Sequence, residues 1–76
     1  MKLFQVTNND KNNSYYRNSE SAWARDKVEA TQVIAKVYKE NHMALPTVWG
    51  VKEHVVPTKA GPMRPYHFTA EEEVRL

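Results

Sequence analysis

Asp26–Asn41, DKVEATQVIAKVYKEN, is the stretch that decides the fold, because it has the clearest helical period in the chain. Its apolar residues recur at helical spacing and form one stripe: Ala30, Val33, Ile34, Val37 and Tyr38. The opposite side is charged or polar, as in a helix that lies on a core. Asp26 can accept a hydrogen bond from the first turn, and Glu29 follows at capping-box spacing. We predict one amphipathic helix over this stretch.

The residues before this helix favour strands. Lys2–Thr7 alternates and is β-prone, and residues 8–14, NNDKNNS, favour a solvated polar hairpin loop because Asn and Asp stabilise turns. Tyr15–Arg25 has two interpretations. It can extend the helix backwards from Asp26, or it can form a second strand with Trp23 at its far end. We favour the strand, because the start of the helix is already marked.

The residues after the helix contain the strongest predicted strand, Thr47–Val56. Trp49, Val51 and Val55 share one of its faces, and this apolar load favours that face for contact with the helix. Tryptophan carries a large apolar surface, so in a small chain we expect both Trp23 and Trp49 in the core or at its edge.

The C-terminal part is less regular. Gly50, inside the strong strand, indicates a bulge or a close backbone contact. Residues 57–65, PTKAGPMRP, form an irregular Pro-rich loop, because three prolines and a glycine oppose any regular element. Tyr66–Phe68 is a candidate short strand. Thr69 is then expected to cap an acidic helical turn over residues 70–74, AEEEV.

These elements predict a single α+β domain over residues 1–76, in which an antiparallel sheet of three to four strands packs against one helix in a ββαβ-like order. A chain of this size buries only about 60% of its unfolded surface on folding. The core must therefore be one layer between helix and sheet. A cleft that excludes water from a small substrate would consume much of that layer, which argues against an elaborate enzyme.

The composition is mildly basic, with 11 Lys and Arg residues, 9 Asp and Glu residues and a formal net charge of +2. Such a balance fits nucleic acid, an acidic protein surface or no charged partner, and it excludes the dense carboxylate field of a nucleic-acid mimic. The lack of cysteine excludes disulfides, a thiol nucleophile and a thiolate metal site. The apolar runs are too short for a signal peptide or a membrane span, so we expect a cytoplasmic protein without a membrane partner.

The residues that could carry chemistry do not form a catalytic pattern. His42, His54 and His67 lack the short ligand spacing of a zinc site, so we predict no metal centre. The adjacent glutamates at positions 71–73 point in several directions, whereas catalytic carboxylate pairs need fixed and different environments. There is no nucleophile elbow, phosphate-binding loop or dinucleotide motif. We predict no catalytic residue and no cofactor, and therefore no enzyme.

Basic and aromatic residues suggest a binding surface instead. Lys52 and His54 lie on the outer face of the strong strand, and Lys59 and Arg64 lie in the loop after it. With nearby aromatic rings, they could form a positive patch with groups on which bases stack. The simpler interpretation is a loop kept soluble by ordinary lysine and arginine. Interfaces often use aromatic anchors, and the candidates in or beside loops are Tyr15, Tyr16, Met63 and Tyr66.

The order of strand, polar hairpin, strand, capped helix, strong strand and basic proline-bearing loop resembles that of small phage host-takeover proteins. Two stretches carry the resemblance: Trp23-Ala24-Arg25-Asp26 running into VEATQVIAK, and VWGVKEHVVPTK. They are similar in pattern to the T7-type inhibitors of bacterial RNA polymerase, and the layout also resembles some basic anti-CRISPR proteins. The resemblance covers about Lys2 to Lys59. It implies a host protein complex as the partner, with Lys52 and Lys59 among the contacts, inside the host cell.

We therefore expect a non-enzymatic binding protein that inhibits a host complex, either a CRISPR effector or RNA polymerase, by steric blocking through its strand edge and proline loop. An alternative is a small nucleic-acid-binding protein that uses Lys52, Lys59 and Arg64 against phosphates. A third possibility is a minor structural subunit that folds against its neighbours.

Overall fold

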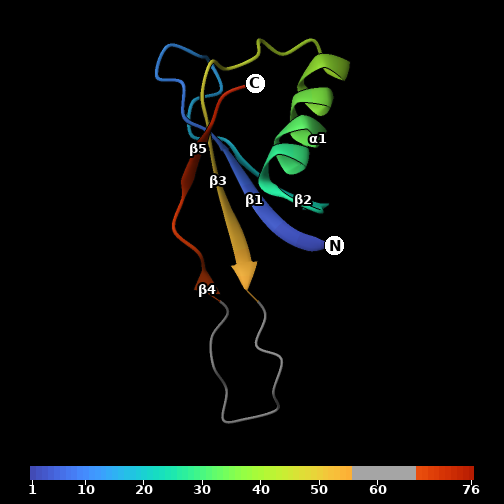
Figure 1. The fold of residues 1–76 in the computed structure, drawn as a ribbon. Helices are drawn as coiled ribbons and strands as arrows, with labels where there is room; N and C mark the ends of the chain where they lie inside the picture. Colours follow the sequence, from blue (N-terminus) through green and yellow to red (C-terminus); the bar gives the residue numbers. More distant parts are fainter. Residues whose placement is uncertain (56–66) are drawn as a thin grey trace, which may run out of the picture.

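The structure, a computed structural model, describes residues 1–55 and 67–76. This part of the chain contains one helix and five strands, shown in Figure 1. In chain order they are β1 (Lys2–Asn8), β2 (Ser19–Ala24), α1 (Lys27–Glu40), β3 (Trp49–Val55), β4 (His67–Phe68) and β5 (Glu72–Val74). All strand pairs are antiparallel, and α1 lies against one face of the sheet. The predicted α+β class, with one helix on one antiparallel sheet, is confirmed.

The sheet has the order β2-β1-β3, and both C-terminal strands pair with the far side of β3. β4 lies beside the end of β3, and β5 lies beside its start, where Val74 is opposite Trp49. The prediction of a Thr69-capped acidic turn is wrong. The Thr69 N–H donates to the Glu53 carbonyl at 2.9 Å, and Glu72–Val74 is a strand. The edge of β3 offers unpaired backbone groups, and pairing with them outweighs the local preference of the acidic run.

The helix begins and ends with clear capping interactions. Asp26 is the N-cap, and its carboxylate accepts a hydrogen bond from the Glu29 N–H at 2.8 Å. The Glu29 carboxylate reaches back to the Arg25 N–H at 3.1 Å, one residue earlier than a standard capping box. At the other end, the His42 and Met43 N–H groups bond to the carbonyls of Lys39 and Tyr38, which is the Schellman pattern.

The preferred interpretation of Tyr15–Arg25 is confirmed in its second half, because Ser19–Ala24 forms β2. The first half belongs to the hairpin loop, residues 9–18, which is bound more tightly than a solvated loop. Asn8, at its start, is fully buried and donates to Tyr38 Oη at 3.3 Å and to Asn13 Oδ1 at 3.1 Å. The Asp10 carboxylate accepts from the Thr47 N–H at 3.0 Å, which ties the loop to the segment before β3.

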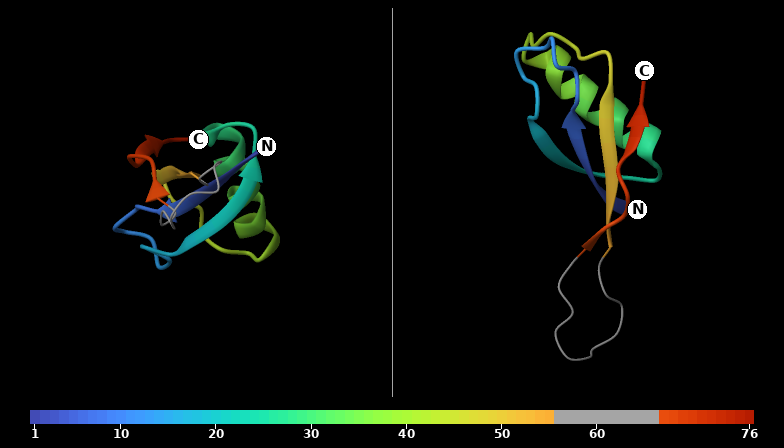
Figure 2. Two further views of the ribbon diagram at one scale, coloured as in Figure 1. Left: turned by 90° about the horizontal axis from the view of Figure 1, so that it is seen from below. Right: turned by 90° about the vertical axis from the view of Figure 1, so that its left-hand side faces the viewer.

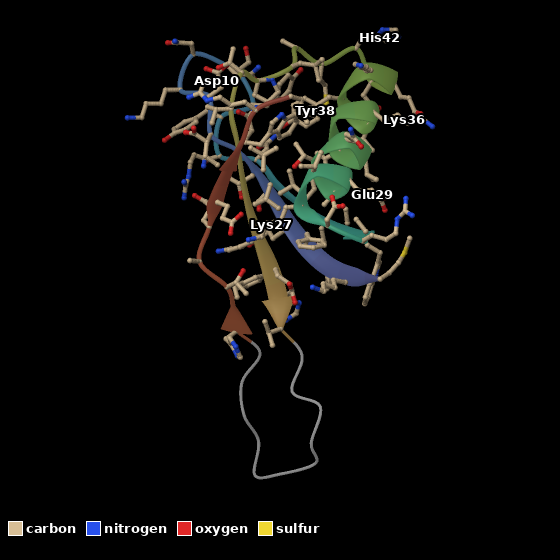
Figure 3. The ribbon with its side chains drawn as sticks, in the orientation of Figure 1. Asp10, Lys27, Glu29, Lys36, Tyr38 and His42 are labelled. Carbon is tan, nitrogen blue, oxygen red and sulfur yellow. The ribbon has the colours of Figure 1, made fainter. Side chains whose placement is uncertain are left out.

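The core lies between α1 and the facing side of the sheet, as the face assignment of Trp49 and Val51 predicted. Tyr38 points from the helix toward the sheet in Figure 3, and its ring meets the Trp49 ring edge-on, with centroids 5.1 Å apart. The predicted helical stripe is correct at Ala30, Ile34 and Tyr38 but not at Val33, which is 41% exposed. Thr31 and Ala35 are buried instead, so the core-facing side is rotated away from Val33.

The expectation for the two tryptophans is correct for one of them. Trp49 is 2% exposed, whereas Trp23 is 61% exposed. Their strands explain the difference. Ala22 and Ala24 of β2 point to the helix and are buried, so Trp23 between them must point to the other face of the sheet.

Candidate binding surface

The face of the sheet opposite α1 carries the candidate site. In the right-hand view of Figure 2, the helix lies behind the sheet and no element of the described chain lies in front of it. Residues paired across an antiparallel sheet point to the same face, so the strand register defines what this face presents. One row crosses four strands, and we call it the outer row: Trp23 of β2, Leu3 of β1, His54 of β3 and Phe68 of β4.

The rings of the outer row form a partly exposed aromatic band. Phe68 is 43% exposed, and its ring centroid lies 5.0 Å from that of His54 with the planes tilted by 32°. Lys52, two residues before His54 on the same face, places its Nζ 4.5 Å from the Phe68 centroid. A cation over an aromatic ring is held by the ring quadrupole, so this contact fixes the ammonium group at the band. The result is an apolar strip with a localised positive charge.

The other end of the same face is acidic and closely packed. Gly50 lies under the side chains of Asn9 and Glu71, and a Cβ at Gly50 would fall 2.6 Å from Glu71 Oε1. Asn9 Nδ2 donates to Glu71 Oε2 at 3.2 Å, and Glu73, opposite Gly50 in β5, pairs with Arg75 at 3.1 Å. The prediction of a bulge or a close backbone contact at Gly50 is wrong, because the register is continuous there and the groups that approach Gly50 are side chains. The face thus has a basic aromatic end and an acidic end.

The structure brings together two of the residues predicted for the site. Lys52 and His54 lie on the outer face, as predicted. Tyr15 is not an open anchor, because its ring meets Tyr38 edge-on at 5.9 Å and packs against the core. Tyr16 is 40% exposed but belongs to the hairpin loop, at the opposite end of β2 from Trp23. The other predicted site residues lie outside the described residues: Lys59, Met63, Arg64 and Tyr66.

Sequence reasoning missed Trp23, Leu3 and Phe68 as members of one surface. The alternation of Trp23 with Ala22 and Ala24 carried the signal, because small residues suit the face of a strand under a helix. The row itself depends on the register between four strands, which no local pattern specifies.

A hollow of about 470 Å³ lies at the N-terminal end of α1, and its lining includes Phe4 and three cationic side chains. Each cation is paired with a carboxylate: Lys2 with Glu53 at 3.6 Å, Arg25 with Glu29 at 2.8 Å and Lys27 with Glu72 at 2.8 Å. The positive charge is therefore neutralised locally. Because its cations are already paired, this hollow is a poor candidate for an anion-binding site. The open face of the sheet is the better candidate for a binding surface.

The shifted pKa values belong to structural contacts. The hydrogen bond from the Thr47 N–H, together with that from Asn12, lowers the pKa of Asp10 below its ordinary value of 3.8. The side-chain hydrogen bond between Arg25 and Glu29 raises the pKa of the guanidinium and lowers that of the carboxyl. Within residues 1–55 and 67–76, no three acidic or histidine side chains are grouped to hold a metal ion.

The chain matches no protein-family model, no curated protein and no solved structure. Among the described residues, no helix is long and apolar enough to cross a membrane.

Proposed function

We propose that this protein is a non-enzymatic inhibitor of a host macromolecular complex, of the phage type, and that it covers a working surface of that complex with the open face of its sheet. The observation that supports the proposal is the outer row, where Trp23 and Phe68 are exposed on a face that no element of the described residues covers. Large exposed aromatic residues are the usual anchors of protein interfaces. They bury a large apolar area on binding and lose little side-chain conformational entropy. A CRISPR effector and RNA polymerase are the two targets to test.

The charges of the face favour a protein partner. Among the described residues, Lys52 and His54 are the basic residues at the aromatic end, while Glu71 and Glu73, the latter paired with Arg75, lie on the same face toward the other end. Binding to nucleic acid normally uses several cations that contact phosphates, and carboxylates on the same face repel the phosphates. A protein surface with an apolar patch and a carboxylate to meet Lys52 is complementary to this pattern. The proposed contact surface is therefore the described part of the sheet, and the contacts predicted in the proline loop lie outside the described residues.

The experiment is capture followed by inhibition. The tagged protein is immobilised and exposed to nuclease-treated bacterial lysate. The retained complex is then identified, purified and assayed for transcription or for target cleavage with the inhibitor added. We expect retention of one stoichiometric complex and loss of its activity.

Phe68→Ser and Leu45→Ser form a matched pair for this assay, because the two side chains are 43% and 44% exposed and only Phe68 lies in the outer row. Phe68→Ser should weaken binding by at least about tenfold, as loss of an interface anchor does, while Leu45→Ser should not. Equal inhibition by both variants would remove the outer row from the proposal.

A second candidate function has one specific observation in its favour. Lys52 beside the Phe68 ring, with Trp23 across the sheet, also resembles the combination of cation and stacking surface that binds single-stranded nucleic acid. That binding should be lost with nuclease treatment and should weaken steeply as salt is raised, whereas the protein complex should survive nuclease.

A further inference from the structure

The outer edge of β2 is an unpaired strand edge. β2 pairs with β1 on one side, and no strand of the described chain lies on its other side. The right-hand view of Figure 2 shows this edge at the border of the sheet. An open edge presents backbone donors and acceptors that another strand can satisfy, so it is a site for strand pairing.

The register identifies which groups face outward. The Asn8 N–H donates to the Asn18 carbonyl at 2.8 Å, and the Asn8 carbonyl accepts from the Arg17 N–H at 2.8 Å, so Asn8 bonds toward the β2 side. Bonding direction alternates along a strand, so the even-numbered residues of β1 and their partners in β2 bond to each other. The outward backbone groups of β2 therefore belong to Ser19, Ser21 and Trp23.

β2 carries few of the features that usually protect an edge. The strand, SESAWA, contains no proline and no lysine, and its register against β1 is continuous. Glu20 is its one charged residue, and because it points to the helix side of the sheet it is the one feature of this strand that discourages pairing. Ser19, Ser21 and Ala22 are small, so another backbone can approach closely.

We propose that two copies of this chain associate through their β2 edges, antiparallel and about a two-fold axis at Ser21. The second copy is the occupant because every molecule carries the same open edge, and two such edges are self-complementary about an axis. With the axis at Ser21, all three outward residues form hydrogen-bonded pairs: Ser21 with Ser21, and Ser19 with Trp23 twice. Glu20 then lies opposite Ala22 of the second copy, so no like charges face each other.

The dimer joins the two sheets into one and places two outer rows on the same side. A partner with repeated or symmetric binding sites would then be held at two points, which raises the apparent affinity without a new type of contact. A contact formed by one short strand pair is smaller than a standard interface, so the dimer is expected to be weak and concentration-dependent. This inference does not depend on the identity of the partner proposed above.

Sedimentation equilibrium of the purified chain tests the proposal, from about 5 µM to about 500 µM, a range that covers weak dimers. The weight-average mass should rise from 8.9 kDa toward twice that value. Amide resonances of Ser19, Ser21 and Trp23 should shift with concentration. A monomer throughout this range would overturn the proposal.

Substitutions at Ser21 locate the contact. Ser21→Pro removes an outward N–H and leaves the ladder to β1 intact, so it should fold and remain monomeric, while Ser21→Ala should still dimerise. Ser21→Lys places two ammonium groups opposite each other at the axis and should lower the association constant by at least about tenfold without altering the fold. Phe68→Ser is the control for association through sheet faces. Association that survives Ser21→Lys but is lost with Phe68→Ser would overturn the β2 assignment.

Discussion

Replacing Trp23 with serine should weaken binding far more than it weakens folding. Trp23 is 61% exposed, so of a tryptophan surface of about 250 Å² roughly 150 Å² is open to a partner. At about 25 cal/mol per Å² this is at most about 4 kcal/mol of transfer free energy. Truncation of interface anchors costs about 2–4 kcal/mol, so we expect a loss of roughly 30- to 700-fold in affinity for the captured complex.

The cost to folding comes from the part of Trp23 that is already covered. That part is about 100 Å², and the unfolded chain also covers some of it, so the free energy of unfolding should fall by about 1–2 kcal/mol. Truncation of Trp49, which is 2% exposed, should cost about 3–5 kcal/mol by contrast. Urea unfolding measures the stability, and biolayer interferometry with the captured complex measures the affinity. Val28→Ser, at a helix residue 50% exposed, is the control for a general loss of apolar surface. Affinity of Trp23→Ser within about threefold of the wild type would refute the assignment of the outer row, since hot-spot residues cost more than that.

Three further predictions concern stability. Asn8→Ala should lower the free energy of unfolding by about 3 kcal/mol, because the buried amide makes three side-chain hydrogen bonds at about 1 kcal/mol each. A loss below about 1 kcal/mol in urea unfolding would show that this network is not required. His42→Gly should stabilise the chain by about 0.5–1 kcal/mol, because His42 has a φ of 55° that glycine adopts without strain. Its melting temperature, followed by circular dichroism, should therefore rise, and a fall would contradict the Schellman assignment. The pKa of Asp10 is lower in the folded chain than its ordinary value of 3.8. Its carboxylate therefore stabilises the fold at a pH above 3.8, and this contribution is lost as the pH falls through the folded pKa. The stability difference between the wild type and Asp10→Ala should be constant near neutral pH and should shrink below pH 3.8, and a difference that grows in acid would contradict the bond from Thr47.

Local patterns were sufficient to predict the elements that are stabilised by nearby residues. The helix begins where Asp26 caps it, and Trp49 and Val51 face the core, because capping and alternation act within a few positions. The acidic run at residues 71–73 shows the limit. Its local preference was for a helical turn, yet Glu72–Val74 pairs with β3, which is separated from it by about 20 positions in the chain. A strand edge that forms elsewhere in the fold cannot be recognised from the three residues that pair with it.

The candidate site depended even more on nonlocal structure. Lys52 and His54 could be assigned to one face from their spacing in a single strand. Their neighbours Leu3, Trp23 and Phe68 come from three other strands, and a register shift of one residue would have turned each of them to the opposite face. The outer row is therefore a property of the sheet as a whole.

The exposure of this row follows from the number of helices. One helix of 14 residues can cover one face of the sheet, and here it covers Phe4, Val6 and Val51. On the face that no described element covers, smaller β-prone residues would fit the strands and would keep less apolar surface in contact with water. Trp23 and Phe68 are nevertheless there, at opposite ends of one row, with Lys52 held against the ring of Phe68. The proposed binding role accounts for this arrangement, and the Trp23→Ser and Phe68→Ser variants test that role at both ends of the row.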